Sequence, residues 1–173
     1  NKVQTSIQEL GDKAEDIYKN ISDSIPNQTV SAMENIGDYL RGELADLGGD
    51  LTQLSTLEKQ LLNMANSEKA TYKAVDKIRK QIGAKIGGSS TKFADEDTAT
   101  LKKIYSLLTD DQEVVANQFG MGEAWQAGKD LVKRRKVLED DAINLFGKNL
   151  NENVMVKLGA ATKKLTDSDH KKF

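Results

Sequence analysis

The chain has no cysteine, one proline and one histidine among its 173 residues. The lack of cysteine excludes disulfides, zinc-thiolate sites and cysteine nucleophiles. Proteins usually carry about 5 % proline, so a single Pro26 leaves nearly the whole sequence without the commonest helix breaker. The chain also lacks long uncharged apolar runs and, at its N-terminus, a basic-then-apolar secretory pattern. It therefore predicts no membrane span and no signal peptide.

The scarcity of histidine restricts the chemistry that the chain can support. Histidine is the one side chain that titrates near neutral pH without perturbation, and His170 lies four residues from the end, where we expect a solvated tail. Serine–histidine triads, histidine-ligated zinc and most proton relays are excluded. A catalytic pair of carboxylates is not excluded, because two of the 27 acidic residues could lie close together in the fold. We predict a non-enzymatic protein with no catalytic residue, no cofactor-binding residue and no metal ligand.

The charges are nearly balanced, with 25 basic and 27 acidic residues and a net charge of −2. No global field therefore draws the chain to nucleic acid or to a membrane surface, although contact with either stays open. We expect protein partners, including a second copy, and no small-molecule substrate. The one dense basic run is Lys133 to Lys136. Consecutive helical residues point in different directions, so a solvated surface is the favoured interpretation. If a phosphate-binding patch exists, Lys129, Lys133 and Lys136 share its face.

Two further motifs favour structural roles. Asp95, Glu96 and Asp97 resemble the opening of a calcium loop, but its later ligands and its glycine are missing. First-turn acids of a helix are the better interpretation. The Gly87–Lys92 segment is similar to a phosphate loop, but neither a preceding strand nor the required spacing is present. We expect a flexible connector and a boundary between two lobes there.

Apolar residues recur at steps of three and four from Val3 almost to the C-terminus, which predicts an all-α fold. Strand-like alternation is absent. Helices are expected to end before Pro26, at Gly48 and Gly49, at Gly87, near Gly120 and at Gly147. Ser55 with Glu58, and Thr109 with Gln112, match the capping-box pattern and predict helix starts. Asn149 or Asn151 is expected to cap a last helix, and Trp125 to be a core anchor.

The expected architecture is a long N-terminal helical hairpin followed by a C-terminal helical bundle. Residues 1–66 form the predicted hairpin, which has a coiled-coil-like spacing and turns at Pro26. Residues 67–173 form the predicted bundle. Because the chain begins at Asn1 without an initiator Met and stops where the pattern of another helix begins, we interpret it as a fragment of a larger polypeptide.

The C-terminal 100 residues carry a pattern of structural rather than catalytic positions. It consists of these residues: Ile78-Arg79 with Ile82-Gly83; Phe93, Asp95 and Asp97; Leu101-Lys102, Ile104-Tyr105, Leu108 and Asp111; Ala124-Trp125-Gln126; and Gly147-Lys148-Asn149. They resemble internal virion or DNA-ejection proteins of short-tailed phages. The resemblance implies a helical module that is packaged in the virion and delivered into the host envelope or cytoplasm. It carries over no site residue.

Three hypotheses for function follow. The first is a non-enzymatic structural or assembly module of a phage internal virion or DNA-ejection protein, which acts through helix–helix contacts. The second is a helical binding module, such as a bacterial sensor ectodomain or a toxin translocation segment, which an exposed apolar stripe from Val3 to Ile25 would favour. The third is a helical accessory domain of a large phage enzyme.

Overall fold

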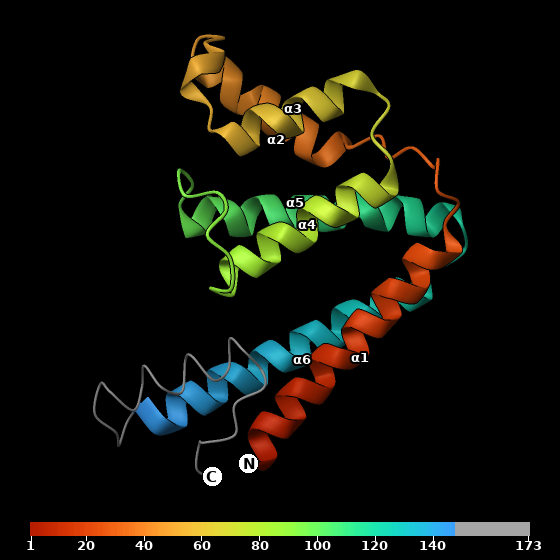
Figure 1. Ribbon diagram of the computed structural model, residues 1–173, viewed down its shortest axis with the longest axis vertical. Helices are drawn as coiled ribbons and strands as arrows, with labels where there is room; N and C mark the ends of the chain where they lie inside the picture. The colour runs from red at the N-terminus through yellow and green to blue at the C-terminus, as the bar shows by residue number, and fades with distance from the viewer. Residues whose placement is uncertain (148–173) are drawn as a thin grey trace. The chain divides into compact units, whose positions relative to one another are not determined.

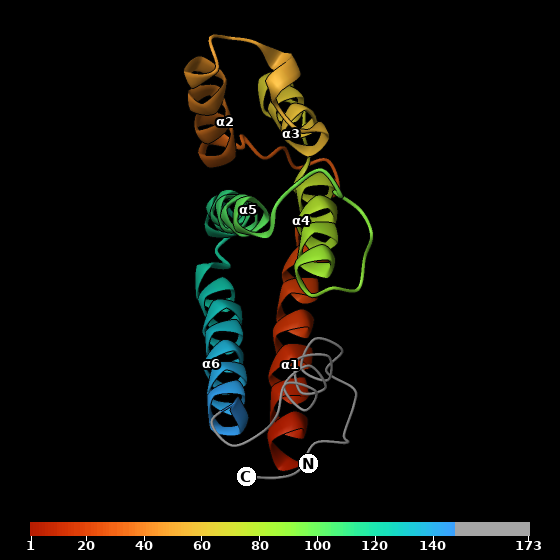
Figure 2. The same cartoon turned by 90° about the vertical axis from the view of Figure 1, so that its left-hand side faces the viewer.

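The computed structural model describes residues 1–147, and all six α-helices in that range are shown in Figures 1 and 2. Their bounds are α1 Lys2–Ser24, α2 Glu34–Asp46, α3 Thr56–Ser67, α4 Tyr72–Ile86, α5 Thr98–Gln118 and α6 Gly122–Gly147. A short 3-10 helix, Leu51–Gln53, connects α2 to α3. The predicted all-α class is confirmed. The last predicted helix and His170 lie outside the described residues.

The chain divides into two compact units. The first combines residues 1–21 with 123–173, and the second comprises residues 22–122. The boundary predicted between residues 66 and 67 falls in the last turn of α3, inside the second unit. A helical hairpin does occur within residues 1–66, but α2 and α3 form it. The helix before Pro26 instead belongs mainly to the first unit, with α6.

In the first unit, α1 and α6 run side by side in opposite directions (Figure 2). The rings of Tyr18 and Trp125 meet edge to face with centroids 4.9 Å apart. Gly128 lies against the same tyrosine, because a Cβ atom there would be 3.0 Å from the ring. Trp125 is fully buried, which confirms its predicted role as a core anchor. An aromatic pair and a glycine thus set the close approach of these two helices.

The second unit has an aliphatic core from α2, α3, α4 and α5. Its fifteen buried members are Met33, Ile36, Leu40, Leu54, Leu57, Leu61, Leu62, Ala65, Ala70, Val75, Ile78, Ile82, Leu101, Ile104 and Leu108. Helix α5 packs on both α4 and α2, and α2 also packs on α3. A pair of backbone hydrogen bonds links the segment before α2 to the start of α4: Ser31 N–H donates to Ala70 O, and Tyr72 N–H donates to Thr29 O, both at 2.8 Å.

Several predicted helix ends are confirmed. Helix α1 ends at Ser24, before Pro26. Gly48 and Gly49 follow α2 with φ of 71° and 81°, a conformation that glycine adopts without steric cost. Ser55 and Glu58 make both hydrogen bonds of the capping box at the start of α3. Local side-chain chemistry is therefore sufficient to locate these ends.

Two predictions within the second unit are wrong. The Gly87–Thr91 loop does not separate two lobes, because α4 and α5 on either side of it pack together in one unit. Helix α5 also does not break at Thr109. The Thr109 hydroxyl donates to the carbonyl of Tyr105 one turn earlier, and the Gln112 amide donates to α4. Neither side chain is thus available to cap a new helix.

We predict that Trp125→Ala lowers the free energy of unfolding by about 3–5 kcal/mol, because it removes a fully buried indole and leaves a cavity beside Tyr18. Chemical denaturation followed by circular dichroism measures the change. Val137→Ala on the same helix is the matched control, since Val137 is 56 % exposed, and it should change stability by less than about 0.5 kcal/mol. Equal effects of the two substitutions would contradict the packing of Trp125 against Tyr18.

Candidate functional site

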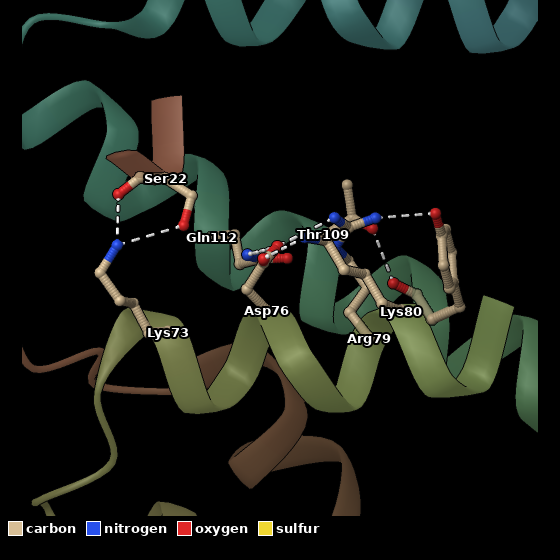
Figure 3. Close-up of polar contacts among 8 residues, drawn as sticks. Ser22, Lys73, Asp76, Arg79, Lys80, Thr109 and Gln112 are labelled. Carbon is tan, nitrogen blue, oxygen red and sulfur yellow. Dashed lines mark hydrogen bonds and ion pairs between the residues drawn. The ribbon is translucent and has the colours of Figure 1, made fainter. Parts of the chain in front are cut away.

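The most concentrated group of buried polar side chains in residues 1–147 lies between α4 and α5 (Figure 3). Helix α4 contributes Asp76 and Arg79, and α5 contributes Gln112; their exposed fractions are 6 %, 5 % and 0 %. Because Asp76 and Arg79 are three residues apart, they lie on the same face of α4. We call Asp76, Arg79, Lys80, Tyr105 and Gln112 the Asp76 cluster.

The carboxylate of Asp76 is the acceptor at the centre of this cluster. Its Oδ1 accepts hydrogen bonds from the Gln112 amide at 2.9 Å and from Arg79 Nη2 at 3.0 Å. Its Oδ2 lies 3.0 Å from Lys80 Nζ, whose side chain reaches solvent. Two cations and one amide therefore neutralise and hold a single buried anion, which is the condition under which a charge is tolerated inside a protein.

Arg79 extends the cluster toward Tyr105 on α5. Its Nη1 donates to the tyrosine hydroxyl at 2.9 Å, and its guanidinium carbon lies 5.5 Å from the ring centroid. The ring also contacts Gly83, where a Cβ atom would lie 3.2 Å from Cε2. Tyr105 is thus held by α4 through both its hydroxyl and its ring, which fixes the spacing of the two helices.

The pKa of Asp76 identifies what this site can do. Burial alone would raise it, but the hydrogen bond from Gln112 and the charge and hydrogen bond of Arg79 outweigh burial, so the pKa lies below its usual value. The pKa of Arg79 is raised in turn: desolvation lowers it, and its interactions with Tyr105 and Asp76 more than offset that effect. Both groups keep their charges at neutral pH. A carboxylate with a lowered pKa is a poor proton acceptor, so the cluster is suited to joining helices.

Asp111, the residue before Gln112, has a second structural role. Asp111 lies on α5, and its two carboxylate oxygens accept the backbone N–H groups of Asn35 at 2.8 Å and Ile36 at 3.1 Å. These amides belong to the first turn of α2, whose own N-cap residue, Met33, makes no side-chain cap and has φ of 53°. Asp111 therefore caps a helix 75 residues away in sequence. Burial raises its pKa, and the two backbone hydrogen bonds offset only part of that rise.

The acidic triplet at residues 95–97 caps two helices. Asp97 is the N-cap of α5 and accepts the backbone N–H of Thr100 at 2.7 Å. The acids therefore lie at a helix N-terminus, as expected, but they precede the first turn of α5, which contains no acidic residue. Asp95 accepts the backbone N–H of Thr56 at 3.2 Å, and Glu96 accepts the hydroxyl of Ser55, both at the start of α3. Burial raises the pKa of Glu96, while the bond from Ser55 opposes this. Within residues 1–147 no group of acids or histidine is arranged to hold a metal ion.

The other candidates from the sequence are not members of the Asp76 cluster. Gly87 to Lys92 connects α4 to α5 and follows a helix, not a strand. On α6, Lys133 and Lys136 are exposed and Lys129 is half-buried, while Arg135 forms a 2.8 Å ion pair with Glu139. A phosphate patch on Lys129, Lys133 and Lys136 stays a prediction. No described helix combines the length and the apolar character needed to cross a bilayer.

Sequence reasoning does not identify Asp76, Arg79 and Gln112 as buried residues. Asp76 and Arg79 follow Val75 and Ile78 of the apolar stripe and border it on one side. The helical period alone does not distinguish them from Lys77, which also neighbours Ile78 and is exposed. For Gln112, the capping-box pattern predicts a helix start instead. Comparison of the chain with protein-family models, with curated proteins and with solved structures found no match. The assignment of this site therefore depends on its geometry.

We predict that Arg79→Met lowers the free energy of unfolding by about 3 kcal/mol, because it leaves the Asp76 carboxylate buried with one cation fewer. This loss is at the lower end of the range for removing one partner of a buried ion pair, because Lys80 still neutralises Asp76. The double variant Asp76→Leu/Arg79→Met removes both charges and should recover most of this loss in urea denaturation. A double variant that is less stable than Arg79→Met would contradict the role assigned to the pair.

We also predict a pH signature for Asp76. Its folded pKa lies below the unfolded value of about 3.9, so it stabilises the fold above about pH 4. This contribution is lost as the pH falls through the folded pKa. Measured from pH 2 to 7, the difference in unfolding free energy between the parent chain and Asp76→Asn should therefore shrink below about pH 4.

The exposed Asp46→Asn at the end of α2 is the control for this titration. Its difference from the parent should be small across the range. If the difference in unfolding free energy between the parent chain and Asp76→Asn stays constant from pH 7 to 2, the folded state does not favour the ionised form of Asp76. That result would contradict the lowered pKa.

Proposed function

We propose that this chain is a non-enzymatic structural or assembly module that acts through helix–helix contacts, and that its parent is an internal or DNA-ejection protein of a phage virion. The structural role is supported by one observation: the buried charged groups join helices to one another. Asp76 and Arg79 join α4 to α5, and Asp111 joins α5 to α2. These groups are committed to packing, as expected for a module whose task is to keep its shape.

The residues that carry the phage resemblance support the second part of the proposal. Ile78, Ile82, Leu101, Ile104 and Leu108 belong to the core of the second unit. Arg79 and Tyr105 belong to the Asp76 cluster, Asp97 caps α5, and Trp125 anchors the first unit. Most of the pattern thus consists of helix-packing or capping positions, which is what a shared structural module would preserve, while Lys102 and Gln126 are exposed. Lys148 and Asn149 lie outside the described residues.

The alternative of a binding module that uses the Val3–Ile25 stripe is less well supported. Ile7, Ala14, Ile21 and Ile25 are each exposed by no more than 3 %, whereas Val3, Leu10 and Ile17 are half-buried. Most of this stripe is therefore already covered and not available for a receptor or a membrane surface. In the proposal that we favour, the chain contacts other copies or other virion proteins through different surfaces. It acts in the virion and is delivered into the host envelope or cytoplasm.

Light scattering coupled to size-exclusion chromatography tests the assembly function. We predict a mass that is a fixed multiple of 19.0 kDa, either a dimer or a ring-sized assembly, over the upper part of a hundredfold concentration range. Trp125→Ala should not be used as the control, because it disturbs the fold. A monomer at every concentration would contradict self-assembly, and would favour a helical accessory domain of a larger enzyme.

A further inference from the structure

An open groove of about 660 Å³ lies on the second unit, between the face of α2, the end of α3 and the last turns of α5. Its lining includes five small apolar side chains: Val30, Ala32, Ala65, Val114 and Val115. Val115 and Ala65 are buried, whereas Val30 and Val114 are 47 % and 49 % exposed. Val30 and Val114 therefore add accessible apolar surface to this groove.

The charges around this groove are mainly negative. Glu34, Asp38 and Glu68 line it, with Arg41 as the one cation in its lining. The guanidinium of Arg41 is already engaged, because it donates to Asp38 at 3.2 Å and to Asn66 at 3.2 Å. Glu34 and Glu68 are exposed. An occupant should therefore present small or aliphatic side chains bordered by cations.

The chain itself contains a segment with these properties. Residues 148–173, outside the described range, carry six lysines and only three acidic residues. The chain as a whole has a net charge of −2, so the remainder is clearly acidic. Val154, Leu158, Ala161 and Leu165 recur at helical spacing. Lys157 and Lys164 precede Leu158 and Leu165 and are seven residues apart, so in a helix both would border the apolar stripe on one side.

We propose that the Val154–Leu165 segment of a second copy docks in this groove, with its apolar residues against Val30 and Val114 and its lysines near Glu34 and Glu68. This inference depends on the proposed function, because it names the contact through which copies of the chain assemble. Reciprocal docking of two such segments gives a closed, two-fold symmetric dimer. Charge complementarity fixes which surfaces meet.

A charge-swap experiment on the full chain tests this proposal. The groove variant is Glu34→Lys/Glu68→Lys, and the segment variant is Lys157→Glu/Lys164→Glu. Each should weaken self-association by at least about tenfold, as measured by sedimentation velocity over a hundredfold concentration range, because like charges then face each other. An equimolar mixture should regain the parent affinity within about threefold, since each variant then offers the charge that the other needs.

The matched control is Glu9→Lys/Glu15→Lys, which makes the same charge change at exposed positions of α1 and should leave the dissociation constant within about twofold of the parent. Circular dichroism verifies that each variant keeps its helices. Self-association that none of the variants alters would overturn the docking proposal and leave the assembly function standing. If each charge-swap variant associates more weakly but their equimolar mixture does not regain the parent affinity, the docking proposal is overturned as well. A parent that stays monomeric throughout, including one whose segment binds its own groove, would overturn both.

Discussion

The burial of the Asp76 carboxylate between α4 and α5 is the constraint on which the rest of the second unit depends. A buried anion is strongly destabilising unless its donors are in place, so Gln112 of α5 must lie within hydrogen-bonding distance of α4. Asp111 is the preceding residue, and it binds the first amides of α2. One turn of α5 therefore binds the buried charge of α4 and also caps α2. Helix α5 is thus the shared packing partner of α4 and α2.

Much of the fold can be predicted from the sequence because helix ends depend on local chemistry. The positive φ at Gly48 and Gly49, the capping box at Ser55, and the cap at Asp97 all follow from neighbouring residues. The packing partner of each helix does not follow from neighbouring residues. An apolar stripe indicates that one face of a helix is buried, but it does not identify the helix that covers this face. The sequence therefore pairs the helix before Pro26 with the next helix along the chain, while the structure groups it with α6.

The candidate site is harder to predict for a related reason. Capping-box residues also occur inside helices, and at Thr109 and Gln112 only the tertiary partners decide between the two situations. Asp111 accepts the backbone N–H of Asn35, which lies 76 residues earlier in the first turn of α2, and no local pattern contains that information. The charged residues beside the stripe of α4 are visible in the sequence, but their role becomes clear only with α5 in place. The proposed assembly function rests on a similar division: the buried polar groups act on helices, while two valines and the carboxylates of the groove remain exposed.

Native-state hydrogen exchange, resolved by residue, tests most directly whether α5 unites the second unit. If it does, the amides of Asn35 and Ile36, although they are in the first turn of α2, exchange only through the same opening that exposes the central amides of α4 and α5, and with the same free energy. Rapid exchange at Asn35 and Ile36 while α4 and α5 remain protected would show that Asp111 does not hold α2, and would contradict the central role of α5 in this unit.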